Sequence, residues 1–298
     1  MLVNDALVKA LGNLTGWEFH TVDLGGHGKL TGLLHKGTFV SVPHLSHGGL
    51  QCPASEKAEA YRWLTTDWFP SQDIRRWEIR DNVAFSPHIT SGKVISYLQL
   101  HNIEKELLPV LPPGIRHKIS KAQRSGFEIR TGKEELAADF YKVYARSMHR
   151  LGSPAMAEQF FAGLAKEYPQ SVIVVAYQDM QVAGATFMLW HNDFAEVCWL
   201  ATNPEYKRLY LSYLLYWESI CIAMRNRCEV FSFGRSTIGS GVHIYKKRWG
   251  TSELNLYWNT SHPSASFLRR LPWLTSVWEK LPFTVVNAIG PAVAKWLY

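Results

Sequence analysis

The sequence predicts an α/β fold of the α+β type, with two halves that contain mixed, largely antiparallel sheets and a helical C-terminal tail. The 298 residues are 47% hydrophobic and 19% charged, a balance typical of a folded chain with a sizeable core. Three apolar runs between residues 172 and 201 are separated only by short turns, which is typical of an antiparallel meander. Prolines and a glycine at 109–114 indicate a boundary. We therefore expect a first half over 1–113, a second half over 114–260 and a tail over 261–298.

The first half is expected to mix short strands with a helix. Apolar and β-branched residues predict strands over 30–34, 38–42 and 94–98. An apolar stripe at helical spacing predicts a helix over 54–69. The pair Gly48-Gly49 marks either a turn or a close approach of the backbone to another group.

The second half has the clearest periodicity. Segments with apolar residues at helical spacing are mixed with β-type apolar runs, and after the meander helices and strands alternate one by one. The expected helices are 115–125, 133–150, 156–167, 206–225 and 239–249, and the expected strands are 127–130, 172–177, 182–190, 195–201, 229–233 and 252–258. A meander followed by helix, strand, helix and strand is the element order of the GNAT acyltransferase core, although the spacing alone also fits other α+β folds.

The charge is unevenly distributed. The net charge is +7, and residues 114–126 contain Arg116, Lys118, Lys121 and Arg124 with no acid among them. Such a cluster is either a solvated basic surface or a site for an anionic partner such as phosphate, nucleic acid or an acidic membrane. The tail combines apolar residues, Trp and basic residues in two short segments. These segments are expected to form helices that either pack on the core or lie on an anionic membrane surface.

The remaining patterns argue against several other classes. The four cysteines form no C-x-x-C pair, so we expect no zinc ribbon or redox motif. No further ligand cluster accompanies His44 and His47 in the sequence, so no other metal site is expected. The start of the chain lacks a basic segment followed by an apolar run, and no 18-residue apolar stretch occurs. A cytoplasmic protein, with possible peripheral attachment to the inner membrane, is the expectation. No pattern in the sequence indicates an oligomeric state.

Five segments resemble the FemAB family of bacterial acyl-transfer enzymes. Residues 40–50 (VSVPHLSHGGL) resemble its S-x-P-F-x-x-Y-G-G segment, and 116–126 (RHKISKAQRSG) resemble its basic R-x-x-I-R-K-A-x-K-x-G helix. Residues 148–154 (MHRLGSP), 231–236 (FSFGRS) and 245–250 (YKKRWG) resemble M-R-R-L-G-T-P, F-D-F-G-R-S and F-K-x-x-W-G. The five segments occur in the family's order. The tail also looks like the end of the subgroup found with exosortase/PEP-CTERM surface-polymer loci.

The resemblance implies two GNAT-like halves with the active site between or beside them. It also implies the transfer of an acyl group to an amine. Family members of known activity take an amino acid from aminoacyl-tRNA and join it to a peptidoglycan precursor, whereas relatives in the wider GNAT group use acyl-CoA. The expected acceptor is an amine on a cell-envelope or exopolysaccharide precursor. The acyl donor, aminoacyl-tRNA or acyl-CoA, stays open, and no further cofactor is expected.

Two residues are the candidates for catalysis. Lys246 matches the family lysine placed near the tetrahedral intermediate, where a cation can stabilise an oxyanion or hold a phosphate. Arg235, expected just after a strand, can grip a phosphate or carboxylate with its guanidinium. Their neighbours Ser236, Tyr245 and Lys247 are assigned to substrate binding. The alternative for Lys246 is an ordinary surface lysine, and the alternative for Arg235 is a structural salt bridge.

Other substrate-binding candidates lie elsewhere in the chain. His47, Gly48 and Gly49 are expected to line the site, as is His44. Arg116 and Lys121 are candidates for binding the phosphates of a tRNA or nucleotide. Asp193, Glu196 and Glu218 are possible proton acceptors, among which the sequence does not choose.

The loop at 203–208 departs from the pattern of CoA-dependent GNAT enzymes. Those enzymes bind pyrophosphate with the backbone N–H groups of a glycine-rich loop before the long helix. Here the stretch is NPEYKR, which has no glycine and contains Pro204. The departure favours aminoacyl-tRNA or another donor, although Lys207 and Arg208 can replace part of the phosphate binding. An acyl-CoA-dependent N-acetyltransferase and a non-catalytic module that binds polymer precursors are the alternative functions.

Overall fold

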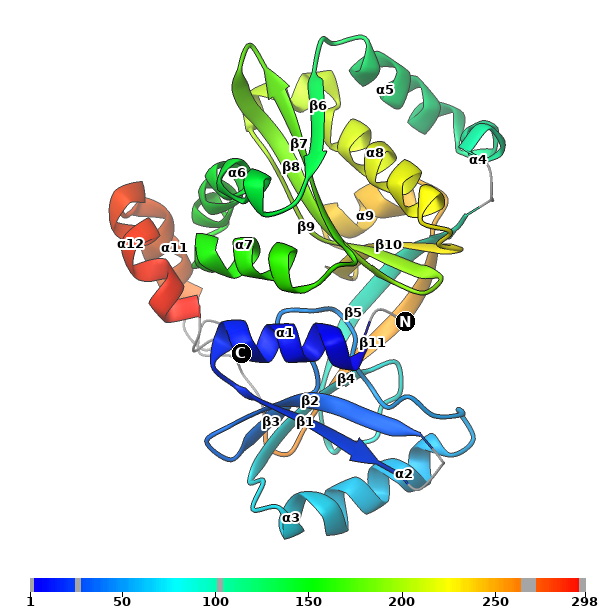
Figure 1. Ribbon diagram of the computed structural model, residues 1–298, viewed down its shortest axis with the longest axis vertical. Coiled ribbons are helices and arrows are strands. Elements are labelled where there is room, and N and C mark those ends of the chain that lie inside the picture. The colour runs from blue at the N-terminus through cyan, green and yellow to red at the C-terminus, as the bar shows by residue number, and fades with distance from the viewer. Residues whose placement is uncertain (1–2, 25–27, 101–103, 264–271, 295–298) are drawn as a thin grey trace.

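The computed structural model describes residues 3–24, 28–100, 104–263 and 272–294, and the side chains of 104–106 and 272–274 lie outside this description (Figure 1). Its strands form one 11-stranded sheet in the order β1-β2-β3-β4-β11-β5-β10-β9-β8-β7-β6. The sheet is mixed, with antiparallel neighbours except for the pairs β3–β4 and β9–β10, which are parallel. The predicted α+β class with largely antiparallel pairing is confirmed.

The first half contains the predicted strands and helix together with elements that the sequence analysis missed. The predicted elements correspond to β2 (Lys29–His35), β3 (Thr38–Val40), β5 (His88–Gln99) and the continuous helix α2 (Lys57–Trp63), a π turn (Leu64–Trp68) and α3 (Phe69–Ser71). The elements not predicted are α1 (Asp5–Thr15), β1 (Glu18–Asp23), β4 (Arg76–Asp81) and α4 (Glu104–Val110).

The second half follows the predicted order throughout. Its helices are α5 (Pro113–Gln123), α6 (Ala137–Arg150), α7 (Glu158–Glu167), α8 (Leu211–Arg225) and α9 (Gly241–Lys247). Its strands are β6 (Glu128–Gly132), β7 (Ser171–Gln178), β8 (Gln181–His191), β9 (Phe194–Thr202), β10 (Val230–Thr237) and β11 (Ser252–Thr260). Strands β7, β8 and β9 pair antiparallel in sequence, which confirms the predicted meander.

Two long strands join the halves into one sheet. Strand β5, from the first 113 residues, pairs with β10 of the second half. Strand β11, which follows α9, inserts between β5 and β4 and so enters the sheet of the first half. In Figure 1 both strands run between the upper and lower parts of the molecule. Side chains from the two halves can therefore meet where β10, β5, β11 and β4 lie side by side.

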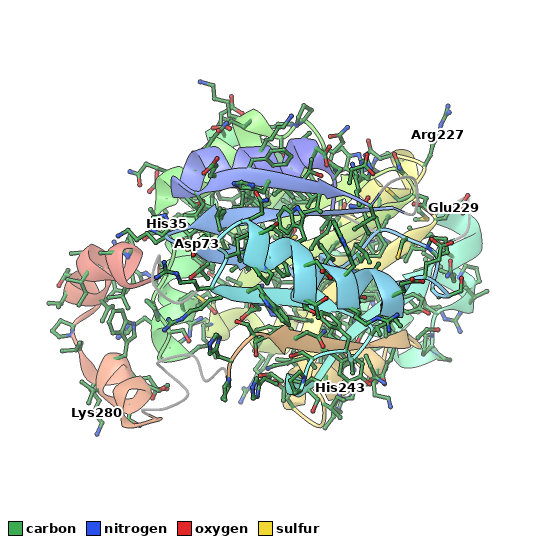
Figure 2. All side chains as sticks on the ribbon, turned by 90° about the horizontal axis from the view of Figure 1, so that it is seen from below. His35, Asp73, Arg227, Glu229, His243 and Lys280 are labelled. Atoms are coloured by element: carbon green, nitrogen blue, oxygen red, sulfur yellow. The ribbon has the colours of Figure 1, made fainter. Side chains whose placement is uncertain are left out.

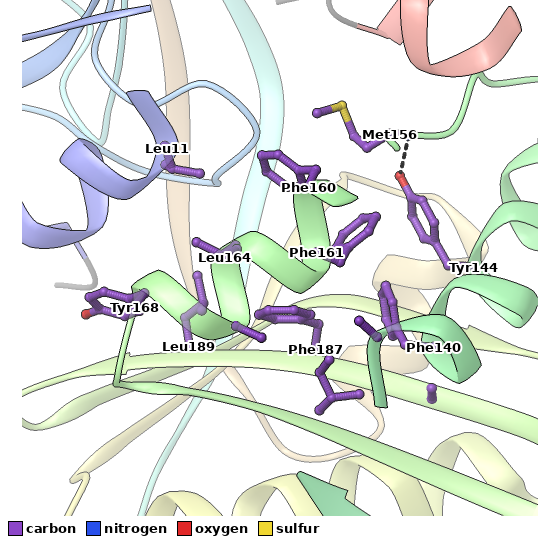
Figure 3. Close-up of a cluster of buried hydrophobic side chains, with 14 of the residues drawn as sticks. Leu11, Phe140, Tyr144, Met156, Phe160, Phe161, Leu164, Tyr168, Phe187 and Leu189 are labelled. Atoms are coloured by element: carbon purple, nitrogen blue, oxygen red, sulfur yellow. Dashed lines mark hydrogen bonds between the residues drawn. The ribbon is translucent and has the colours of Figure 1, made fainter. Parts of the chain in front are cut away.

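The meander separates two hydrophobic cores because alternate residues of a strand point to opposite faces. Ile173 and Val175 of β7 belong to the core under α6 and α7, whereas Val174 and Ala176 belong to the core under α8 and α5. Phe161 of α7 packs among aromatic rings of α6 and β8 in the first of these cores (Figure 3). Burial of large apolar side chains on both faces fixes the position of β8 and β9, on which the candidate site depends.

Helix α1 belongs to the first half and packs against the second. It begins at Asn4, whose side chain accepts a hydrogen bond from the N–H of Leu7, and it ends at Gly16 with a positive φ of 73°. Leu7 and Leu11 on its buried face belong to the same core as α6 and α7, and Figure 3 shows Leu11 beside α7. The first helix of the chain therefore stabilises the second half as well as the first.

The tail forms a pair of helices, α11 (Pro272–Lys280) and α12 (Phe283–Ala294). Both helices pack against α6, and the Tyr141 hydroxyl donates a hydrogen bond of 3.0 Å to Asn287 of α12. Of the two arrangements expected from the sequence, packing on the core is present. Across the described ranges, no helix combines the length and the apolarity that crossing a bilayer demands.

Candidate functional site

The candidate site is built around a bulge in β10. The pairing of β10 with β5 shifts register between Ser232 and Arg235, and Gly234 at the bulge has a φ of +72°. A Cβ at Gly234 would lie 3.0 Å from the carbonyl oxygen of Val197, so glycine suits both the backbone conformation and the space. The bulge turns the carbonyl groups of Gly234 and Arg235 toward α9, where they accept hydrogen bonds.

Lys246 of α9 donates those hydrogen bonds. Its side chain is buried, with 3% of the residue exposed, and Nζ donates to Gly234 O at 2.9 Å and to Arg235 O at 3.0 Å. An ammonium group has three N–H donors, so one N–H remains beyond these two bonds. Burial, aided by the charge of Arg235 and opposed by that of Glu196, lowers the pKa of Lys246 to about 8.

A second set of contacts fixes α9. The Ser240 side chain accepts the N–H of His243 at the start of this helix. The ring of His243 accepts the Gly239 N–H at Nδ1 (2.9 Å) and lies 2.7 Å from Glu253 Oε1 through Nε2. Because Nδ1 accepts, Nε2 carries a proton and donates to the carboxylate. The orientation of the helix that carries Lys246 is thus set by side chains on both sides of it.

Arg235 lies inside β10, because the strand continues to Thr237 beyond the bulge. The expectation that Arg235 follows the strand is therefore wrong; the bulge at Gly234 interrupts the sequence pattern without ending the strand. Its Nη1 donates to Leu45 O at 2.9 Å, and its guanidinium lies 5.6 Å from the centre of the Trp258 ring. This contact joins β10 to residues 40–50, so two of the family-like segments meet here.

Arg80 of β4 is a central residue that the sequence analysis missed. Its Nη1 donates to the same Leu45 carbonyl at 2.8 Å, and its guanidinium lies 4.5 Å from the centre of the Trp258 ring. Glu78 accepts its Nε–H at 2.8 Å. Two arginines from different halves therefore share one carbonyl and one indole, and this concentrates positive charge around Leu45.

The histidines of the 40–50 segment have different environments. Burial, followed by the charges of Arg80 and Arg235, lowers the pKa of His44 to about 3, so its imidazole is neutral at physiological pH. His47 instead faces Asp81, with Nε2 3.5 Å from Oδ1. The structure therefore brings His44 to the arginines and His47 to a separate acidic residue.

Asp81 is the centre of a buried polar cluster below this segment. It accepts hydrogen bonds from Lys57 (2.8 Å) and from the Tyr61 hydroxyl. Burial acts to raise the pKa of Asp81, but the nearby His47 ring and the hydrogen bonds from Lys57 and Tyr61 outweigh this and lower it to about 2. A Cβ at Gly49 would overlap the Asp81 carboxylate. Of the two interpretations of Gly48-Gly49, the close backbone approach is therefore the one present.

Glu196 is the one of the three predicted proton acceptors whose charge acts on Lys246. It is buried in β9, and its Oε2 accepts the Ser232 hydroxyl at 2.9 Å, which in turn accepts the Gly234 N–H at 3.0 Å. Asp193 lies in the β8–β9 turn, where its carbonyl accepts the N–H of Glu229. Glu218 lies on α8.

Ser236 follows Arg235 and Lys247 follows Lys246, but the two side chains differ in burial and in their contacts. Ser236 is buried, and its Oγ makes no hydrogen bond with the described residues. A buried hydroxyl of this kind is a candidate for contact with a bound ligand. Lys247 is half-exposed and lies 3.8 Å from Glu253 through Nζ.

The basic helix α5 and Tyr245 meet through an aromatic cluster. Lys118 donates to the Tyr213 hydroxyl at 3.2 Å, and Lys121 lies 5.2 Å from the centre of the Tyr210 ring. Tyr213 packs 4.8 Å from Tyr245, the residue before Lys246. The helix is thus next to the aromatic neighbours of the site.

The side chains of Arg116, Lys207 and Arg208 are exposed. Lys207 and Arg208 lie in a short 3₁₀ turn, Pro204–Leu209, directly before α8. No contact joins these three residues to Lys246 or Arg235 among the interactions of the described residues. In the described part of the chain, no group of three or more His, Cys, Asp or Glu side chains is arranged to hold a metal ion.

Comparisons with known proteins agree with this architecture. Residues 114–247 match the family model of the acetyltransferase (GNAT) domain. A comparison with curated protein sequences finds no match. Among solved structures, FemX is similar with a TM-score of 0.65 and 11% identity, over 86% of this chain and 91% of FemX.

Further similar structures have related folds. L-PGS from Bacillus licheniformis has a TM-score of 0.57 and 10% identity, over 92% of this chain and 93% of that one. A tandem GNAT protein from the clavulanic acid biosynthesis pathway has a TM-score of 0.51 and 12% identity, over 84% of each chain. The chain thus has the fold of a tandem GNAT protein, with two GNAT-like halves, the matched GNAT domain in the second of them, and a helical C-terminal tail.

Proposed function

We propose that this protein is an N-acyltransferase of the FemAB type that transfers an amino acid or another acyl group to an amine of a cell-envelope or exopolysaccharide precursor. The observation that carries the proposal is the buried ammonium group of Lys246, held by two backbone carbonyls at the β10 bulge with one N–H remaining. The resemblance of 231–236 and 245–250 to FemAB segments supports it, because these segments supply the bulge and the lysine. The fold similarity to FemX is consistent with it.

The chemistry follows from the charges at the site. The neutral acceptor amine attacks the activated carbonyl, and a C–N bond forms while negative charge develops on the carbonyl oxygen. The remaining N–H of Lys246 donates to that oxygen. When the intermediate collapses, the bond to the leaving oxygen or sulfur breaks and the leaving group takes up the proton released by the amine. Glu196 keeps Lys246 in its charged form, since its negative charge raises the lysine pKa against the effect of burial.

The turn before α8 favours a donor other than acyl-CoA. The side chain of Asn203 accepts the N–H of Glu205 at 3.2 Å, and its carbonyl accepts the N–H of Tyr206 at 3.1 Å. Pro204 has no N–H. These backbone positions are the ones that a pyrophosphate-binding loop would direct to a ligand, and here they are already used or lacking. Aminoacyl-tRNA is therefore the donor we propose, with acyl-CoA as the alternative.

The test is a donor screen with purified protein and its Lys246→Ala variant. Aminoacyl-tRNA and acyl-CoA are offered with amine-bearing envelope precursors, and product is followed by mass spectrometry. We expect Lys246→Ala to reduce turnover about 100-fold or more, the scale seen when one oxyanion donor is removed. Lys166→Ala, which removes an exposed lysine of α7, is the matched control and should keep the full rate.

The outcomes separate the parts of the proposal. Full activity of Lys246→Ala would show that the lysine has no role in catalysis. Saturable binding of acetyl-CoA in calorimetry, together with turnover of acyl-CoA, would replace the tRNA donor by acyl-CoA. Precursor binding without turnover of any donor would favour a non-catalytic binding module.

A further inference from the structure

Helix α12 is apolar on both of its faces. Residues 281–294 (LPFTVVNAIGPAVA) contain no charged side chain. One face is buried in the molecule through Val286, Gly290 and Ala294. At Gly290 the helix comes close enough to Ala155 that an added Cβ would lie 3.4 Å from its backbone nitrogen. This face accounts for the attachment of the tail to α6 and its C-terminal loop.

The opposite face is apolar and exposed. Val285 and Ile289 are 43% and 44% exposed, and they lie one turn apart on the same side of the helix. Ala288 and Ala292 lie on this side too and are exposed. A soluble surface helix ordinarily carries charged residues on its outer face, so an uncharged outer face on a helix whose inner face is already packed indicates a partner.

Neighbouring helices add further apolar and basic groups. Val277 of α11 is exposed, as is Leu151 at the end of α6. Leu151 adjoins α11, because a Cβ on the following Gly152 would overlap Thr275. Lys280 ends α11, and Figure 2 shows its side chain at the outer edge of the projecting hairpin.

The described charged residues around the hairpin include more cations than acids. Arg146 of α6 lies over the ring of Phe283, 5.6 Å from its centre. Burial and the nearby charge of Arg146 lower the pKa of Arg150 on the same helix, and Arg150 donates a hydrogen bond of 3.1 Å to Thr202 O at the end of β9. The described acids in this region are Glu279, next to Lys280, and Asp139, which is already paired with Lys142. Glu158 is also near, because its charge acts on Tyr141, which donates a hydrogen bond to Asn287 of α12.

We propose that the exposed face of α12 rests in the interface of an anionic lipid membrane, with Lys280 and Arg146 facing the headgroups. An apolar helical face inserts its side chains at the boundary of headgroups and acyl chains, and nearby cations add attraction to anionic lipids. The hairpin projects from the edge of the molecule beside α6 (Figures 1 and 2), so a broad surface can reach it. A partner protein or a second copy would leave the surrounding cations without a matching charge, whereas an anionic bilayer supplies it.

The test is flotation of the full chain with vesicles. One set contains phosphatidylcholine alone, and the other contains phosphatidylcholine with phosphatidylglycerol. We expect binding to the anionic set, weakened by salt, and little binding to the neutral set. The double variant Val285→Asp/Ile289→Asp should reduce the partition coefficient about tenfold or more, because it removes two inserted apolar side chains and adds repulsive charge.

A matched control adds the same charge elsewhere. Val110→Asp/Met180→Asp changes two exposed apolar residues in α4 and in the β7–β8 turn, and it should bind vesicles like the unchanged protein. Circular dichroism and thermal melting establish that both double variants are folded. The proposal is overturned if the α12 variant floats as well as the unchanged protein, or if neutral and anionic vesicles bind equally. It is also overturned if the α12 variant instead converts a dimer to a monomer in sedimentation.

Discussion

The burial of Lys246 has a measurable effect on stability. Its pKa in the folded protein is about 8, against an ordinary value of 10.5, because burial disfavours the ammonium form. The unfolded chain therefore binds the proton more tightly, and the charged lysine destabilises the fold. This penalty is fully present below pH 8 and is relieved as the pH rises from 8 toward 10.5. Between pH 7 and 9.5 the relief is about 2 kcal/mol of unfolding free energy, by proton linkage.

The assay compares the protein with Lys246→Met, which keeps the side-chain length and removes the charge. Urea unfolding at pH 7, 8, 9 and 9.5 gives the unfolding free energy of both proteins. Other groups titrate in both, so their effects cancel in the difference. We expect the stability of the unchanged protein relative to Lys246→Met to rise by about 2 kcal/mol over this range. A difference that stays constant would refute the view that a desolvated ammonium group lies at the bulge.

Two further predictions concern the supports of the site. Gly234→Ala forces a residue with a side chain into a positive φ of 72°, which should lower the unfolding free energy measured in urea by about 1–3 kcal/mol. It should also reduce turnover more than the control Gly114→Ala, because an added Cβ at Gly114 meets no other atom within 4 Å. Asp81→Asn leaves buried Lys57 without its carboxylate, so the loss at pH 7 should be about 3 kcal/mol or more; a loss below 1 kcal/mol would mean that the cluster is not a net support for the 40–50 segment.

The second half was predictable because its signals are local. Short turns between long apolar runs indicate an antiparallel meander. Because this sheet has a hydrophobic core on each face, its strands carry apolar residues on both faces and appear in the sequence as nearly continuous apolar runs. The extra length of β10 was not visible, since Gly234 and Arg235 interrupt the apolar run inside the strand. Lys246 was identified by resemblance to a family segment, and its burial could not be read from a sequence in which it stands beside Lys247 and Arg248.

Two of the four elements missed in the first half, α1 and β4, were missed for different reasons. Helix α1 had usable signals, an Asn before its first turn and a Gly at its end, so capping rules could have found it. Strand β4 had only a weak signal, because in RWEIRD the alternation consists of Trp77 and Ile79 alone and the other residues are all charged. Its charged residues Arg80 and Asp81 are buried only because distant segments supply their partners.

The shared sheet determines how the candidate site is assembled. Trp258 of β11 contacts Arg80 of β4 and Arg235 of β10, and both arginines donate to Leu45 O. The carbonyl of Arg235 in turn accepts a hydrogen bond from Lys246. A continuous set of contacts thus runs from the first half to the ammonium group. Any displacement of one half against the other must disturb the Arg235 backbone, so the placement of Lys246 depends on both halves although the lysine belongs to the second alone.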